Sequence, residues 1–431
     1  GMAQSSFRQP MPVGLDKQRA TGYIFTPERQ PAPLVYANFY PSGGLWTTGA
    51  DMGQFIIGQL RGGLPGGAAV FSPETRALMQ QGQFSQDPRL EGWTYGFFEH
   101  FENGQRLIGK DGDYPGFSSA LYLLPEHELG FFLSYNATVS SGAGVIDPRL
   151  VFPSAFLAHY YPDRPAWLPV KTSNQAANLA GYYRLARYSH TTIDKAISPM
   201  AILQWRIEAN PDGSLSLAYP ALLGGQTSQW VEVGPRLFQS PATGSFLSYA
   251  EDADGRVNRV YTKITEEGVL ERVGWYETLA FQGGLLGLVV VVFVATLVVL
   301  AFRWLGRQRQ KTPDTAPVRL PPGLVGRLLK LVPAMAGALS GLNLLFLAGL
   351  ALTISQSMTT RAPTIPGYFM VLLALPLAAL VLTVLLAATS GLAWGCRAGS
   401  TAGRIGLSLI SLAGLAFTWF ASYWNLLGYK L

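Results

Sequence analysis

The last third of the sequence contains four long apolar runs, and they restrict the possible folds more than any other feature. The runs cover residues 279–302, 331–354, 367–394 and 405–427. Each is at least as long as the roughly 20 residues that a helix needs to cross a bilayer core. One such run could be a buried helix of a water-soluble domain. Four in succession, almost without charges, predict four transmembrane helices in residues 278–431.

The charges between these runs predict their orientation. Residues 279–431 hold 11 Lys and Arg and one acid, Asp314. The second connection has only Arg361, and the basic residues of the first and third are Arg303, Arg307, Arg309, Lys311, Arg319, Arg327, Lys330, Arg397 and Arg404. By the positive-inside rule these two connections face the cytoplasm. We therefore predict a multi-pass protein of the cell membrane, with residues 1–278 in a periplasm or outside the cell.

The remaining composition excludes several classes of partner. Residues 1–278 hold 21 Lys and Arg against 25 Asp and Glu, so the basic excess belongs to the membrane part and predicts no nucleic-acid binding. The acidic turn at Asp252 and Asp254 lacks the glutamate of a calcium loop, and the histidines have no ligand spacing. We expect no metal and no other cofactor, and no feature sets an oligomeric state. Cys396 is the single cysteine, so no disulfide can form within the chain.

The first 162 residues read as an α+β domain. In "PSGGLWTTGADMGQFIIGQLRGG", Thr48 is a candidate N-cap and Gly62 follows the last helical residue. Strands are expected near residues 92–101, 105–110, 119–124 and 130–136, and a helix near 148–160. Residues 163–175 read as a linker because of their prolines.

Residues 176–277 change in character. Asp-Gly turns at residues 211–213 and 253–255 lie between segments that alternate apolar and polar residues, which predicts hairpins. We expect a small antiparallel barrel or sandwich that leads directly into the first apolar run.

The tripeptide Lys110-Asp111-Gly112 suggests chemistry. A lysine on a strand that faces a cleft can hold an anionic group or help to activate a serine. A following glycine lets a substrate lie along the strand, and a backbone N–H just beyond it can face a developing oxyanion. A solvated lysine in a turn is the alternative reading of the tripeptide alone.

The order of "GGLWTTGADMGQF", "YGFFEH" and "KDGDYPGFSSALYLLPEHELGFFLSYN" resembles the C-terminal half of the serine β-lactamase and penicillin-binding protein family, in particular its class C-like branch. The resemblance covers about residues 1–160. It implies the C-terminal part of an α/β sandwich with an antiparallel sheet. Residues 176–277 are similar to the small lipocalin-like β-barrel that often follows this hydrolase domain.

By this resemblance Lys110 is the cation of the family's third motif, Gly112 its glycine, and the N–H of Asp113 the strand side of the oxyanion hole. Asp111, Ser118 and Asn136 are implied to contact substrate. Two departures stand out. Asp111 replaces the usual hydroxyl residue and could pair with Lys110, and Asp113 adds a second negative charge that disfavours carboxylate-bearing ligands.

The family's nucleophile motif, Ser-x-x-Lys, does not occur, because no lysine here has a serine three residues before it. Tyr36-Ala37-Asn38 and Lys171-Thr172-Ser173 match the letters of other family motifs but lie in the wrong places. We expect the nucleophile to lie upstream of Gly1, so that the polypeptide by itself is inert.

The resemblance implies a membrane-anchored serine hydrolase that acts on amides or esters, either small molecules such as β-lactams or peptides such as peptidoglycan stems. The alternative is a non-catalytic binding or sensor protein built on a degenerate form of this fold. A transporter role for the helices is less favoured, because they lack buried acids or paired charges.

Overall fold

The computed structural model describes residues 1–25, 30–36, 40–64, 67, 69–139, 147–162, 175–197, 202–220, 225–263, 268–309, 323–360 and 367–430. The chain divides into two compact units. The first comprises Gly1–Tyr183 and Trp205–Arg272, and the second comprises Arg184–Gln204 and Val273–Leu431. The predicted linker at 163–175 lies almost entirely outside the described residues.

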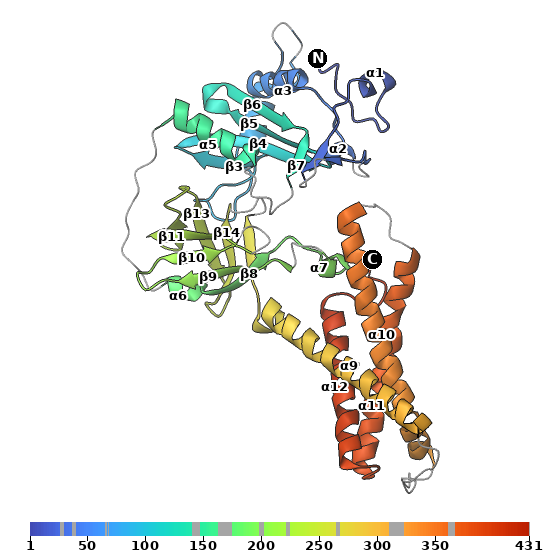
Figure 1. Cartoon of the computed structure of the whole chain (residues 1–431). Helices are drawn as coiled ribbons and strands as arrows, with labels where there is room; N and C mark the ends of the chain where they lie inside the picture. Colours follow the sequence, from blue (N-terminus) through green and yellow to red (C-terminus); the bar gives the residue numbers. More distant parts are fainter. Residues whose placement is uncertain are drawn as a thin grey trace. The chain divides into compact units, whose positions relative to one another are not determined.

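A four-stranded antiparallel sheet of order β3-β4-β5-β6 forms the centre of the N-terminal part (Figure 1). Its strands are β3 (Phe98–Glu102), β4 (Gln105–Tyr114), β5 (Phe117–Leu124) and β6 (Leu129–Tyr135). Two-residue turns join β3 to β4 and β4 to β5, and their glycines have positive φ, 74° at Gly104 and 82° at Gly116. The second strand extends four residues beyond the predicted end, so Lys110 lies in the middle of a strand and not in a turn.

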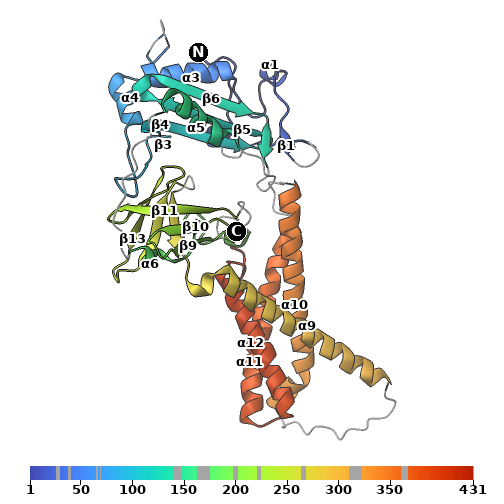
Figure 2. The same cartoon turned by 60° about the vertical axis from the view of Figure 1, so that its left-hand side comes forward.

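Helices cover both faces of this sheet, as Figure 2 shows. On one face α3 (Gly49–Arg61) packs Met52 and Ile56 against Ile108 of β4, and on the other α5 (Pro148–Tyr160) packs Leu157 against Leu107. Successive residues of a strand point to opposite faces, so β4 is buried on both sides in its first half. The predicted N-cap of α3 is confirmed, since the Thr48 hydroxyl accepts a hydrogen bond from the Asp51 N–H.

Shorter elements surround the sheet. The helices are α1 (Val13–Asp16), α2 (Tyr40–Gly43) and α4 (Pro73–Gln80), and η1 (Pro125–His127) joins β5 to β6. A small second sheet has the order β2-β1-β7, where β1 (Tyr23–Phe25) pairs in parallel with β7 (Ala137–Val139) and antiparallel with β2 (Gln30–Pro31).

The second β structure is a closed eight-stranded barrel, preceded by α6 (Ala176–Leu179). Its strands are β8 (Gly181–Leu185), β9 (Trp205–Ala209), β10 (Leu215–Ala218), β11 (Thr227–Gly234), β12 (Leu237–Gln239), β13 (Phe246–Glu251), β14 (Val257–Thr262) and β15 (Val269–Arg272). Trp205, Trp230 and Phe238 are almost completely buried and fill the core. The predicted hairpin turns join β9 to β10 and β13 to β14.

The second unit contains four helices that are long and apolar enough to cross a membrane. They are α9 (Leu279–Arg309), α10 (Leu324–Thr360), α11 (Gly367–Gly395) and α12 (Thr401–Tyr423). In both views α10, α11 and α12 run side by side and α9 crosses them obliquely. Phe293, Leu339, Leu373 and Phe417 form the interior of this bundle.

The segment 184–204, with α7 (Asp194–Ile197), packs against the ends of these helices. The Ile193 N–H donates to the carbonyl of Lys430 at 2.7 Å, and Ile193 belongs to the apolar core of the bundle. Arg184 lies 3.2 Å from the Glu277 carboxylate and donates to the Tyr423 hydroxyl at 2.9 Å. These contacts make the segment part of the helical unit.

Candidate active site

The second half of β4 lies at an edge of the sheet. Strand β3 pairs with residues 105–109 and no further, the last pair being Phe98 with Gly109. Within the described ranges, no strand pairs with residues 110–114 on that side. The site that the sequence predicts at Lys110 therefore lies on a strand segment with one free side.

The two tight turns determine which backbone groups of β4 face this edge. The residues that flank a two-residue turn exchange hydrogen bonds, and the bonding side then alternates along an antiparallel strand. Tyr114 and Phe117 flank the turn and form the first hydrogen-bonded pair. Counting back in steps of two residues, the backbone N–H and C=O groups of Gly112 and Lys110 also bond to β5. The N–H and C=O groups of Asp111 and Asp113 then face the free edge. Among the described residues, neither of these two N–H groups has a hydrogen-bond partner.

The side chain of Lys110 lies on the same face of the sheet as α3. Lys110 is opposite Leu121, and Gly112 is opposite Ser119, whose hydroxyl is 2.9 Å from that of Ser134. Lys110 is exposed and makes no ion pair or hydrogen bond within the described part of the chain. A Cβ atom added to Gly112 would meet no atom within 4 Å. A free ammonium and open space therefore lie side by side on this face.

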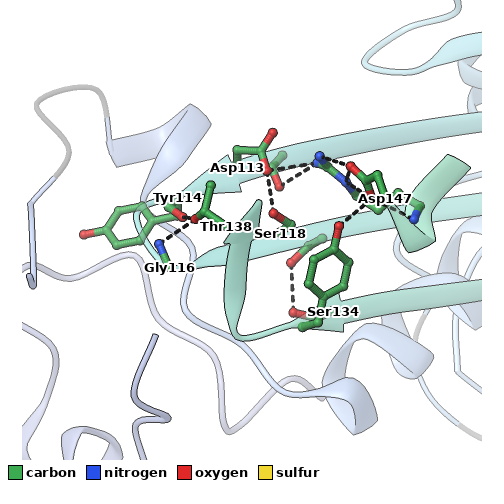
Figure 3. Close-up of polar contacts among 11 residues, drawn as sticks. Asp113, Tyr114, Gly116, Ser118, Ser134, Thr138 and Asp147 are labelled. Atoms are coloured by element: carbon green, nitrogen blue, oxygen red, sulfur yellow. Dashed lines mark hydrogen bonds and ion pairs between the residues drawn. The ribbon is translucent and has the colours of Figure 1, made fainter. Parts of the chain in front are cut away.

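The other face carries a network of polar groups, drawn in Figure 3. The Ser118 hydroxyl donates to the Asp113 carboxylate at 2.7 Å, and Arg149 of α5 contacts the same carboxylate at 3.1 Å. Arg149 also pairs with Asp147 at 2.7 Å, and Asp147 accepts a hydrogen bond from the Tyr135 hydroxyl. This network ties the start of α5 to the end of β4.

Electrostatics within the network fix its charged states. Burial raises the pKa of Asp147, but hydrogen bonds from Arg149 and Tyr135 outweigh that effect and the pKa is lowered. Burial disfavours the charged guanidinium of Arg149, yet Asp147 and Asp113 raise its pKa overall. Both groups are therefore ionised at neutral pH.

Asp111 lies on this face too, because it follows Lys110 by one residue and points the opposite way. The expected pairing of Lys110 with Asp111 does not occur for this reason. Burial raises the pKa of Tyr122 to about 12, and the charge of Asp111 contributes in the same direction. No ion pair of Asp111 is present in the ranges that the structure describes.

The remaining predicted contacts lie away from Lys110. Ser118 is only 2% exposed, and its hydroxyl lies on the α5 face, opposite to the face of Lys110. Asn136 follows β6 and donates through Nδ2 to the carbonyl of Thr21 at 2.8 Å, while its own carbonyl accepts from the Tyr23 N–H. These bonds hold β1 against β7.

Sequence reasoning missed Arg149, Asp147 and Tyr135. Asp147 before Pro148 is a recognisable helix start, and its carboxylate accepts from the Arg149 N–H. Nothing local to that segment shows that Arg149 also reaches Asp113 in β4. Ala37, Asn38 and residues 171–173 of the other motif-like strings lie outside the described residues. In the part of the chain that the structure describes, no group of three or more His, Cys, Asp or Glu side chains could hold a metal ion.

Comparison with known proteins identifies a similarity in the N-terminal part of the chain. The beta-lactamase family model matches residues 1–155. The human protein beta-lactamase-like 1 is 29% identical over 110 residues, which cover 24% of this chain and 21% of the relative. The chain thus spans about a fifth of the length of that curated relative.

Two solved structures are also similar. SurE has 16% identity and a TM-score of 0.36, and the match covers 59% of this chain and 55% of SurE. The octameric penicillin-binding protein homologue from Pyrococcus abyssi has 15% identity and a TM-score of 0.30, with 63% of this chain and 55% of the homologue covered. At these scores the solved structures add nothing to the assignment, which rests on the family model. Over residues 1–155 the chain is similar to the beta-lactamase family.

Proposed function

We propose that residues 1–162 provide one wall of the active site of a membrane-anchored serine hydrolase that cleaves amides or esters. The observation that carries the proposal is the free edge of β4. It presents the N–H of Asp113, the open space at Gly112 and Lys110, whose side chain has no ionic partner in the described part of the chain. The family match over residues 1–155 supports the reaction class.

Each group has a role in acyl transfer. A serine oxygen attacks the substrate carbonyl carbon, and the N–H of Asp113 donates to the oxygen that becomes negative. One oxyanion donor of this kind contributes roughly 10²–10³-fold to the rate. Lys110 holds an anionic part of the substrate or favours the ionised serine, and Gly112 leaves room for the substrate backbone. The C–N or C–O bond then breaks, and the amine or alcohol leaves with the proton that the serine gave up. Water then hydrolyses the acyl-serine to a carboxylic acid and the free serine.

The attacking serine and its base are not among the groups at this edge. Because the 431 residues contain no Ser-x-x-Lys, we propose that both belong to polypeptide outside them. The alternative, a binding module without catalysis, is favoured by one feature. Asp111 places a carboxylate where a hydroxyl would assist the reaction.

The helices suit the role of an anchor. All four are long and apolar enough to span a bilayer, and Arg303, Arg397 and Arg404 belong to the connections that the positive-inside rule places in the cytoplasm. The hydrolase wall and the barrel would then face the cell exterior or a periplasm, where small molecules and cell-wall peptides are available as substrates.

Labelling of the native gene product in its own membranes with a fluorescent fluorophosphonate tests the proposal. We expect one labelled serine, and Lys110→Ala should slow labelling at least about 10-fold. Gly112→Leu should also block it while leaving the fold intact, because the added side chain enters empty space.

Lys17→Ala is the matched control, since Lys17 is exposed in the loop after α1. Labelling that is indifferent to both Lys110→Ala and Gly112→Leu would contradict the proposed wall. A native protein without any serine adduct would favour the binding module instead.

A further inference from the structure

The free edge of β4 carries opposite charges on its two faces. Lys110 lies on the α3 face without an ionic partner in the described part of the chain, and Asp111 lies on the α5 face, also without one. A ligand that lies along this edge meets both charges at neighbouring positions. The inference below rests on the proposed function in this one respect, that an extended ligand occupies the edge.

Strand geometry predicts which side chains of a ligand these charges would favour. A chain that pairs with β4 places the side chain opposite Lys110 on the α3 face and the next one, opposite Asp111, on the α5 face. Residues directly opposite in an antiparallel pair lie about 5 Å apart, within reach of an ion pair. Neighbouring ligand residues therefore meet opposite charges.

The α5 face remains negative after its internal pairing. Asp111, Asp113 and Asp147 supply three carboxylates, and Arg149 is the cation that contacts two of them. The side chain of Asp113 is still 56% exposed. On the α3 face, Asp51 is buried and accepts hydrogen bonds from Gln4 and Ser5, so it does not offset Lys110 at the surface.

A second copy of the chain is a poor occupant of this edge. If two β4 edges paired antiparallel about Gly112, Asp111 of one copy would lie opposite Asp113 of the other. Like charges at directly opposite positions destabilise a strand pair, and charged edge residues commonly prevent such pairing. The charge pattern thus disfavours self-association and leaves room for a different chain.

We propose that the edge at residues 110–114 selects an extended peptide in which an acidic residue adjoins a basic one. The acidic side chain faces Lys110 and the basic side chain faces Asp111. The ligand's backbone bonds to the N–H and C=O groups of Asp111 and Asp113. This assigns a substrate class to the proposed active-site wall.

Binding of four fluorescein-labelled, N-acetylated hexapeptides to the full chain in nanodiscs tests the inference. The peptides share one backbone and differ in their two central residues, which are Lys-Glu, Lys-Gln, Gln-Glu or Gln-Gln, because a ligand antiparallel to β4 meets Asp111 before Lys110. Fluorescence anisotropy at low salt should rank Lys-Glu tightest, with each charge worth about two- to five-fold in Kd. The preference should disappear at about 0.5 M salt, where the screening length is only a few ångströms.

Variants of the chain assign each preference to one residue. Asp111→Asn should abolish the preference for lysine and keep that for glutamate, and Lys110→Gln should do the reverse. Glu126→Gln and Lys17→Gln remove the same charges at exposed positions outside residues 110–114 and should change nothing.

Equal affinity for all four peptides would overturn the charge selection while leaving the proposed wall intact. Binding of none, in a protein whose native form still takes the fluorophosphonate label, would also overturn it. Loss of that labelling, by contrast, would speak against the proposed function and not against the peptide preference.

Discussion

The two β structures of the first unit, the barrel and the N-terminal sheet, differ in how completely their strand edges are paired. In the barrel each of the eight strands has a neighbour on both sides. In the N-terminal sheet, among the strands that the structure describes, β4 has a second neighbour for only half its length. An unpaired edge offers backbone groups to any passing strand, and proteins usually close or protect it. The barrel therefore reads as a structural module, and the free half of β4 is the surface at which we propose that a ligand binds.

The largest effect is expected in the closed structure. Trp230 is 1% exposed in the barrel core, and its replacement by alanine should lower the free energy of unfolding by about 3–5 kcal/mol. Denaturant unfolding of the full chain in detergent, followed by near-UV circular dichroism, measures this. Trp275 is 73% exposed, so Trp275→Ala is the control and should change stability by no more than about 0.5 kcal/mol. Equal losses for both variants would show that the barrel core is not packed as described.

Proline substitution compares the two edges directly. Val260 of β14 pairs with Tyr249 on one side and Leu270 on the other, so Val260→Pro breaks the ladder and should cost about 3 kcal/mol or more. Asp111→Pro removes an N–H that faces no partner strand among the described residues and should cost less than about 1 kcal/mol. Thermal unfolding of both variants measures the difference. Similar losses would mean that the β4 edge is paired in solution.

The pH dependence of stability tests the contacts of β3, the strand that pairs with the first half of β4. His100 of β3 lies 3.0 Å from the Glu91 carboxylate and 3.3 Å from that of Glu102. Burial alone would lower the pKa of His100, but the hydrogen bonds to Glu102 and Glu91 outweigh it and raise the pKa to about 9. An unfolded histidine titrates near about 6.5. The stabilisation is therefore complete below about pH 6.5 and is lost as the pH rises through about 9.

The melting temperature of the wild type should fall between pH 7 and pH 9.5, and His100→Gln should remove most of that slope. The control is His159→Gln, because His159 is exposed on α5. A slope that survives in His100→Gln would assign the pH dependence to other groups.

The smallest effect is expected at Lys110. The side chain is exposed and, within the described residues, has no ionic partner. Lys110→Gln should therefore change the free energy of unfolding by less than about 0.5 kcal/mol and leave the melting temperature almost unchanged. A large loss of stability would mean that Lys110 has a structural role, which would contradict its proposed role in the active site. Differential scanning fluorimetry is sufficient to decide.

Local signals in the sequence were enough for much of this fold. The N-cap Thr48 begins α3 as predicted, and Gly62 ends α3 with a φ of 82°. These features depend on residues within one turn of each other, which is why they can be read from sequence. The four apolar runs likewise correspond to four long helices.

The features of the structure that the sequence could not predict depend on contacts between distant segments. The predicted strand at 105–110 continues to Tyr114, because β5 pairs with it over its whole length. The face on which each residue of Lys110-Asp111-Gly112-Asp113 lies follows from that pairing. Arg149 joins Asp113 only because α5 packs across the sheet, and no local pattern reports this contact.

Residue-resolved hydrogen exchange of the full chain in detergent tests the free edge most directly. The amides of Lys110, Gly112 and Tyr114 bond to β5 and should exchange slowly, while those of Asp111 and Asp113 between them should exchange much faster. Amides of the barrel strand β14 serve as the slow reference. We expect this alternation along a single strand. Uniform protection from Lys110 to Tyr114 would contradict it, because it would show that the edge is already occupied.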